Sequence, residues 1–200
     1  MRFLAAALVL LAPAVARADF LPACTRAAFE LVIDRSGSMT GAPIDGAKAA
    51  AAAAVDKLGT NDCVGVIAFD SSPTTIVPMQ TLLDPGAVKA AIARIQAGGG
   101  TEILSALTAA HRAMQRQGAA RTKHVILLTD GQSPIAGIQM LAQTMNSEHI
   151  TITTIGYGSS VDAQTLRMIS DTASGRYFNV MDPNALTRVF TRDVDMTLRP

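Results

Sequence analysis

The sequence is poor in aromatic residues, in charge and in cysteine. Trp is absent, aromatic residues make up 4% of the 200 residues, and Asp, Glu, Lys and Arg together make up 16%. Apolar residues still reach 49%, so a core would be built mainly from Ala, Val, Ile, Leu and Met. This composition excludes an intrinsically disordered chain. The length fits one domain that can fold without the help of disulfides or bound metal.

Runs of like charge are also missing. The 17 Lys and Arg nearly balance the 16 Asp and Glu, and the chain has no basic patch. Without residues 1–18, which contain two arginines, the formal charge becomes −1. A chain of this kind is not suited to bind the phosphates of nucleic acid or anionic lipid, and we predict no nucleic-acid partner.

A signal peptide is predicted for residues 1–18. Arg2 supplies positive charge, residues 3–15 form an apolar run broken only by one proline, and residues 16–18 have the small-x-small pattern of a cleavage site. The run is too short for a comfortable membrane span, and no later segment replaces it. We therefore predict an exported protein, periplasmic or secreted, without a membrane span in the mature chain. The predicted divisions of that chain are an N-terminal extension (19–26), one domain (27–195) and a tail (196–200).

The two cysteines leave three alternatives open. Cys24 and Cys63 each precede an apolar segment predicted as a strand, and if those strands are parallel neighbours their starts would be close enough for a disulfide. Two buried thiols are the second alternative. The third is lipid attachment at Cys24, because residues 21–24 resemble the bacterial lipoprotein pattern, although Pro22 fits that pattern poorly.

From Phe29 onward, short apolar runs alternate with stretches of helical period. This alternation predicts an α/β fold, a doubly wound, mostly parallel six-stranded sheet with helices on both faces. The predicted strands are Phe29–Ile33, Cys63–Phe69, Thr74–Val77, His124–Thr129, Ile150–Ile155 and Tyr177–Val180. The predicted helices are Ile44–Leu58, Pro85–Ile95, Glu102–Gln117, Ile138–Glu148, Ala163–Asp171 and Asn184–Val194.

One of these strands is predicted to be antiparallel. Thr74–Val77 follows the second strand after only four residues, which is too short for a parallel crossover but fits a hairpin. Pro78 then predicts an edge strand, because proline cannot donate to the ladder.

Three oxygen-bearing side chains follow the first predicted strand at alternate positions. Asp34, Ser36 and Ser38 can converge on one point at the end of that strand, where ligands of open α/β sheets usually bind. One carboxylate and two hydroxyls suit a hard cation such as Mg²⁺. Taken alone, the segment is also compatible with a turn in which these side chains cap backbone N–H groups.

Two further donors are expected at the same edge of the sheet. Thr101 follows the triple glycine 98–100, and Asp130 directly follows the apolar strand His124–Thr129. Asp-x-Ser-x-Ser, a distant Thr and a later Asp together resemble the metal-ion-dependent adhesion site of the von Willebrand factor type A family. The segments 64–69 and 100–107 also look like that family, and the resemblance covers roughly residues 27–195.

The resemblance implies how these residues would act. Ser36, Ser38 and Thr101 would offer hydroxyl oxygens to one Mg²⁺, Mn²⁺ or Ca²⁺, and Asp34 and Asp130 would bind it directly or through water. An open coordination position would take an Asp or Glu carboxylate of a protein partner. Integrin β-type relatives have extra acids for an adjacent site, but residues 40–43 supply none, so a single ion is expected.

Catalysis and a purely structural metal are the alternatives to partner binding. An aspartate-nucleophile phosphohydrolase also has an acid at the end of its first strand beside Mg²⁺, but it needs a second acid two residues later as general acid and base. Ser36 occupies that position, and we therefore predict that the protein is not an enzyme. Asp62 and Asp70 are interpreted as turn residues, and His111, His124 and His149 as ordinary surface or packing residues.

Overall fold

The structure, a computed structural model, describes residues 24–199 as one mixed sheet with a layer of helices on each face. The strands are β1 (Ala27–Asp34), β2 (Cys63–Phe69), β3 (Pro73–Thr81), β4 (Thr122–Thr129), β5 (Ile150–Tyr157) and β6 (Tyr177–Val180). The helices are α1 (Ala42–Val55), α2 (Pro85–Ala93), α3 (Ile103–Gln115), α4 (Ile138–Ser147), α5 (Ala163–Thr172) and α6 (Pro183–Leu198), with a 3₁₀ turn, η1, at Gly37–Met39.

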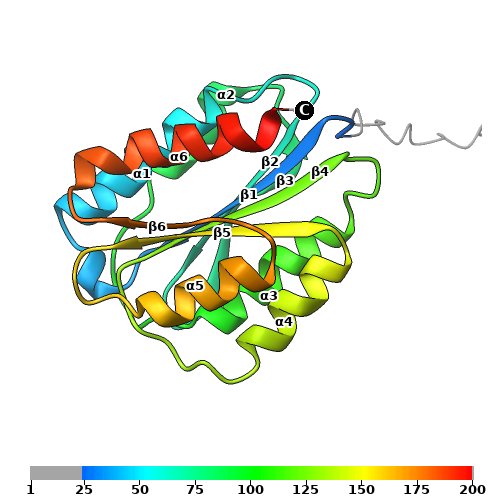
Figure 1. The fold of residues 1–200 in the computed structure, drawn as a ribbon. Helices are drawn as coiled ribbons and strands as arrows, with labels where there is room; N and C mark the ends of the chain where they lie inside the picture. The colour runs from blue at the N-terminus through cyan, green and yellow to red at the C-terminus, as the bar shows by residue number, and fades with distance from the viewer. Residues whose placement is uncertain (1–23, 200) are drawn as a thin grey trace, which may run out of the picture.

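The strand order is β3-β2-β1-β4-β5-β6. Only β3 runs antiparallel to its neighbour, and the remaining pairs are parallel. Helices α1, α2 and α6 lie on one face of the sheet, and α3, α4 and α5 lie on the other (Figure 1). This arrangement confirms the α/β class and the doubly wound sheet predicted from the alternating pattern.

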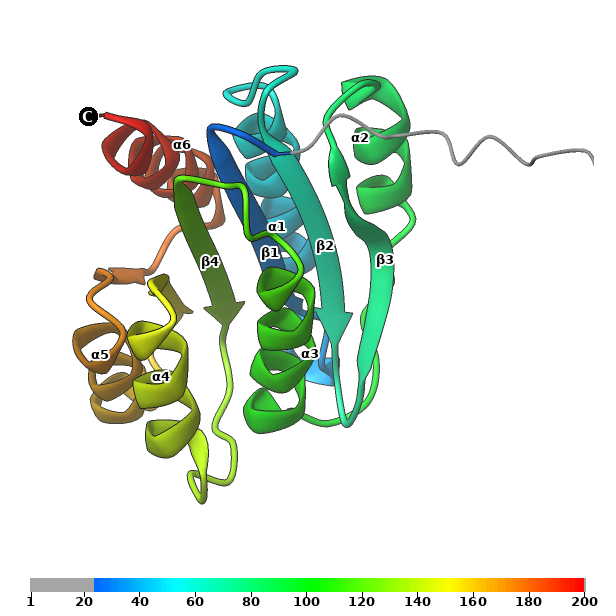
Figure 2. The ribbon, with the colours of Figure 1, turned by 90° about the vertical axis from the view of Figure 1, so that its right-hand side faces the viewer.

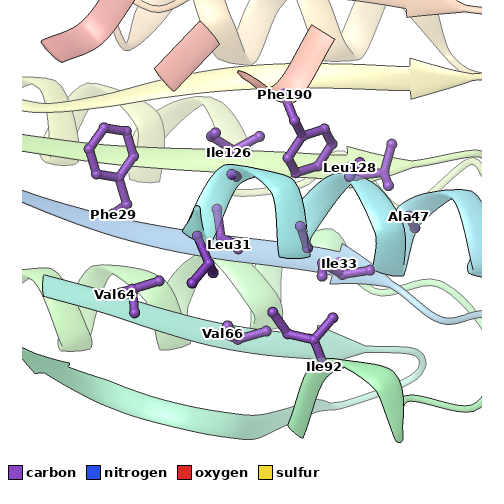
Figure 3. Close-up of a cluster of buried hydrophobic side chains, with 14 of the residues drawn as sticks. Phe29, Leu31, Ile33, Ala47, Val64, Val66, Ile92, Ile126, Leu128 and Phe190 are labelled. Carbon is purple, nitrogen blue, oxygen red and sulfur yellow. The ribbon is translucent and has the colours of Figure 1, made fainter. Parts of the chain in front are cut away.

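The central strands are buried on both faces. All eight residues of β1 and all seven of β2 are buried, as expected for strands whose apolar residues follow one another without alternation. On the α1 side, Phe29, Leu31 and Ile33 of β1 pack against Phe190 of α6 and the alanines of α1 (Figure 3). The small alanine side chains let α1 approach the sheet closely, so the end of β1 has a rigid support.

The hairpin at the edge of the sheet confirms one prediction and extends it. β3 is antiparallel to β2 and lies at the edge, but it has nine residues rather than four and continues through Pro78. The ladder shifts register between Val64 and Val66, and no pairing partner is recorded for Pro78, which is exposed. An edge strand can include proline in this way because the missing N–H faces no neighbouring strand.

Helix α6 and the segment directly after β1 also differ from the prediction. Helix α6 ends at Leu198, four residues beyond the predicted Val194, so part of the segment predicted as a tail is helical. The η1 turn was not predicted from the sequence at all.

Cys24 and Cys63 form a disulfide, with their Cα atoms 5.3 Å apart. Ala28 of β1 pairs with Cys63 of β2, so the two strand starts lie side by side as the sequence suggested. The bond uses the sulfur that lipid attachment at Cys24 would require. Within residues 24–199, no helix has both the length and the hydropathy needed to span a bilayer. The predicted signal peptide, residues 1–18, lies outside the described residues.

Candidate metal centre

The candidate site lies where the chain changes direction across the sheet. β1 and β4 are neighbours, and the segments that follow them lead to helices on opposite faces. Asp34 is the last residue of β1, and Asp130 is the first residue after β4. The carboxyl ends of two such strands form the crevice in which open α/β sheets bind ligands.

A chain of hydroxyl and carboxylate contacts joins the two strand ends. The hydroxyl oxygens of Ser36 and Ser38 are 3.0 Å apart. Ser38 donates a hydrogen bond of 2.8 Å to Oδ1 of Asp130, 92 residues later in the sequence. Ser38 is exposed and Ser36 is buried, so this row of oxygens leads from the interior to the surface.

Asp34 forms the buried end of this row. Its Oδ1 accepts a 2.7 Å hydrogen bond from the backbone N–H of Ser36, and its Oδ2 accepts one from the hydroxyl of Thr129. Burial raises the pKa of Asp34, and the nearby charge of Asp130 acts in the same direction, while the hydrogen bonds from Thr129 and Ser36 oppose the rise. Two carboxylates this close to each other favour a positive charge beside them.

Thr101 reaches the site through contacts between loops. The N–H of Gly37 donates to the carbonyl of Gly99 at 3.0 Å, and the N–H of Gly98 donates to the carbonyl of Arg35 at 2.7 Å. The hydroxyl oxygen of Thr101 lies 3.0 Å from the position that a Cβ on Gly131 would occupy. The triple-glycine loop therefore packs on the Asp34–Ser38 segment and places Thr101 beside the residue that follows Asp130.

Asp70 lies against the glycine loop, a position that the sequence did not reveal. Its carboxylate accepts from the N–H of Ser72, as a turn residue would, but it also pairs with Arg35 at 2.7 Å. A Cβ on Gly99, which has a φ of +90°, would lie 2.8 Å from the Asp70 Cβ. Only glycine fits this close approach and this backbone conformation.

The sequence model of the von Willebrand factor type A domain matches residues 30–192, which is most of the chain. The chain belongs to this family. An uncharacterized protein of Synechocystis sp. is 31% identical to this von Willebrand factor type A (vWA) domain over 163 residues, which are 80% of this chain and 39% of the relative. The chain thus spans about two fifths of that relative's length.

Solved structures of the same fold include a von Willebrand factor type A protein from Catenulispora acidiphila. It is 26% identical, with a TM-score of 0.79, over 87% of this chain and 43% of its own. Proximal thread matrix protein 1 from the mussel byssus, solved with a zinc-occupied adhesion-site motif, is 21% identical. Its TM-score is 0.76, and the match covers 89% of this chain and 47% of that protein.

The donor set of this vWA domain fits a hard divalent cation. All five predicted side chains offer oxygen, three of them as neutral hydroxyls, and none offers nitrogen or sulfur. Across residues 24–199, no group of three or more His, Cys, Asp and Glu side chains gathers to hold a metal. Oxygen-only donors of low total charge fit Mg²⁺, Mn²⁺ or Ca²⁺ better than they fit Zn²⁺, which is usually bound by nitrogen and sulfur.

The remaining candidates lie elsewhere. Asp62 is buried, pairs with Arg26 and accepts from the N–H of Gly59 at 2.8 Å, so it stabilises the turn before β2. His111 contacts Glu148 on the α3–α4 side of the sheet. His124 is buried and belongs to a hydrogen-bond network with Asp193 that the sequence did not reveal.

Proposed function

We propose that this vWA domain binds a protein partner through one divalent cation, with an Asp or Glu carboxylate of the partner as the last ligand. The observation that carries this proposal is the convergence of hydroxyl and carboxylate oxygens from three loops at the junction of β1 and β4. When bound, Mg²⁺ supplies positive charge and a coordination position for an external anion. Domains of this family typically serve interaction and adhesion.

Each of the five residues would contribute to cation binding according to its position in the site. Ser36, Ser38 and Thr101 offer neutral oxygens that leave most of the cation's charge uncompensated. Asp130 is partly exposed and hydrogen-bonded to Ser38, so it would adjust as the cation binds. Asp34 is buried, with both carboxylate oxygens already accepting hydrogen bonds, and would orient Ser36 while it contributes negative charge.

The decisive experiment removes one oxygen donor at a time. Ser38→Ala is expected to lower Mg²⁺ affinity at least about tenfold, and Asp34→Ala to abolish measurable binding, in calorimetric titration of the purified chain. Proteins retained from an extract in Mg²⁺ should be released by a chelator and should not be retained by either variant.

The control is Asp56→Ala, which removes an exposed acid at the far end of α1 that pairs with Lys89. This variant should bind Mg²⁺ and partner like the wild type. Ser38 is exposed, so its variant should fold even if Asp34→Ala does not. If the partner is still retained in the presence of chelator, or if Ser38→Ala retains it as strongly as the wild type does, the metal has only a structural role. Phosphatase activity that disappears in Asp34→Asn would favour the hydrolase alternative.

We also propose that the chain is exported after removal of residues 1–18. The Cys24–Cys63 disulfide supports this, because such bonds persist in oxidising compartments. N-terminal sequencing of the exported protein is expected to begin at Asp19. An acylated Cys24 as the first residue, visible as an added lipid mass, would contradict both the disulfide and the cleavage site.

A further inference from the structure

A shallow groove follows the exposed side of α3 away from the candidate metal centre. Two adjoining hollows form it, with volumes of about 570 and 300 Å³, and both are lined by Ala109 and Arg112. The first hollow begins at Glu102, next to Thr101, and the second continues between α3 and the edge strand β3. Figure 2 shows α3 on this side of the molecule, with β3 along one flank and α4 on the other.

The floor of the groove is built from small side chains. Ser105, Thr108 and Ala109 line the first hollow and Ala113 the second, so between Leu104 and Arg112 the lining from α3 consists of small side chains. Pro73 of the β2–β3 hairpin and Pro134 of the loop after β4 line the first hollow as well. Small residues beside two prolines leave room for the backbone of an extended segment rather than for one bulky side chain.

Positive charge gathers at the end of the groove that is far from the metal centre. Arg112 and Arg116 are exposed, lie one helical turn apart and line the second hollow. Neither makes an ion pair with any residue between 24 and 199. The acid at the near end, Glu102, accepts a hydrogen bond from the N–H of Leu104, so it caps the start of α3.

We propose that this groove binds an extended acidic segment of the protein partner, whose first carboxylate completes the metal centre and whose second pairs with Arg112 and Arg116. The inference rests on the function proposed above and specifies its ligand. Charge complementarity supports it, because a bound cation at one end and two unpaired guanidinium groups at the other both attract carboxylates. Continuity supports it as well, since the groove begins at the residue after Thr101.

The geometry of α3 fixes the spacing of the two acids. Ile103 and Arg112 are nine positions apart in the helix, which corresponds to about 14 Å of rise, and Arg116 lies about 6 Å further. An extended segment advances about 3.3 Å per residue, so the second carboxylate should follow the first by about five residues. Two adjacent acids could not reach both ends of the groove.

The test compares two eight-residue peptides of equal composition. One has Asp as its first and sixth residues, the other as its first and second, with Ala, Ser and Gly elsewhere. Titration into the isotope-labelled chain in Mg²⁺, followed by NMR, is expected to show roughly fivefold tighter binding of the first peptide, with shifts along α3 as far as Arg116. Arg112→Gln combined with Arg116→Gln should remove this preference.

The matched control is Arg94→Gln, because Arg94 is an exposed arginine directly after α2, on the opposite face of the sheet. It should leave the preference intact. The groove inference would be overturned by equal binding of the two peptides or by failure of both to bind. It would also be overturned if Arg94→Gln removed the preference as fully as the double substitution at Arg112 and Arg116. Mg²⁺ titration without peptide tests the metal centre separately. If the protein binds Mg²⁺ but its preference between the peptides does not depend on Arg112 and Arg116, the proposed function stands and only the groove inference fails.

Discussion

Replacing Asp193 by Ala is expected to lower the free energy of unfolding by about 3–5 kcal/mol, measured by urea denaturation at pH 7. Asp193 is a fully buried carboxylate of α6 that accepts hydrogen bonds from three side chains. The substitution would leave Nε2 of His124 buried without its acceptor, and an uncompensated buried polar group carries its full desolvation cost.

The contacts of Asp193 join three elements of the fold. Nε2 of His124, in β4, donates to Oδ2 at 2.8 Å. The hydroxyl of Thr153, in β5, donates to Oδ1 at 3.0 Å, and Nε of Arg176, directly before β6, donates to the same oxygen at 2.6 Å. The hydroxyl of Thr151 lies 2.6 Å from the other nitrogen of the His124 ring. The network therefore fixes α6 against the centre of the sheet.

The pH dependence of this effect follows from the pKa of Asp193. Burial alone would raise it, but the hydrogen bonds and charges of His124 and Arg176 outweigh burial and hold the pKa below its ordinary value. An acid with a depressed pKa in the folded state contributes stability above its unfolded pKa of about 3.9, and this stability is lost as the pH falls below that value. The difference between wild type and variant should therefore shrink below about pH 4.

The control for this substitution is Asp195→Ala, two residues further along α6. Asp195 pairs with Lys57 at the surface, where both side chains are 42% exposed. Exposed pairs contribute little, so this variant should lose no more than about 1 kcal/mol. Equal effects at the two positions would mean that the buried network does not stabilise α6.

The place of the candidate metal centre could be predicted because the proposed ligands follow strand ends that can be recognised in the sequence. Apolar runs identify β1 and β4, and the parallel arrangement puts the residues after them at the same edge of the sheet. Asp34 and Asp130 are therefore placed by the fold alone. Thr101 follows a loop rather than a strand, so it was expected at this edge from its place after the triple glycine and not from a visible strand end.

The buried polar network could not be predicted in this way. His124 and Asp193 are 69 residues apart, and their contact depends on which side of α6 faces β4. Helical period places Asp193 beside apolar residues, but the sequence does not show which neighbour would neutralise it. Thr129 was missed for a related reason, since a threonine at the end of a strand is typical of any buried β-strand.

The extension of β3 shows the limit of local rules at a sheet edge. Pro78 correctly predicted an edge strand, but the predicted strand stopped at Val77, directly before it. At the edge the same proline is tolerated, and the strand continues to Thr81, whose neighbour in β2 is Cys63. The tertiary environment, rather than the propensity of the segment, decides where this strand ends.

Glu30 has a large expected effect on stability because its carboxyl is buried without a partner. It is 1% exposed in β1, and its Oε2 makes no hydrogen bond. Burial raises the pKa of Glu30 to about 8. Because the folded pKa lies above the unfolded one, the folded state keeps a proton that the unfolded state releases. Stability should therefore fall as the pH rises from about 4.5 to about 8, by roughly 3–5 kcal/mol, in urea denaturation at each pH.

The neighbours of Glu30 explain why nothing relieves this cost. Its partner in β2 is Gly65, and a Cβ there would lie 2.4 Å from Oε2, so the carboxyl fills the space that a side chain would otherwise take. Its partner in β4 is Val125, which offers no donor side chain. The acid thus lies in the apolar layer between the sheet and α3, where only its neutral form is stable.

Two variants separate the charge of Glu30 from its shape. Glu30→Gln keeps the shape of the side chain but does not titrate. The difference in free energy of unfolding between wild type and this variant should therefore change by roughly 3–5 kcal/mol between pH 5 and pH 9. Glu30→Met also removes the carboxyl with its unpartnered Oε2. This variant should exceed the wild type in stability at pH 8 by about 2–4 kcal/mol, because an apolar side chain of similar length fits the apolar layer. If Glu30→Gln keeps the wild-type pH profile, the carboxyl does not titrate in the folded core, and the slope must come from other groups.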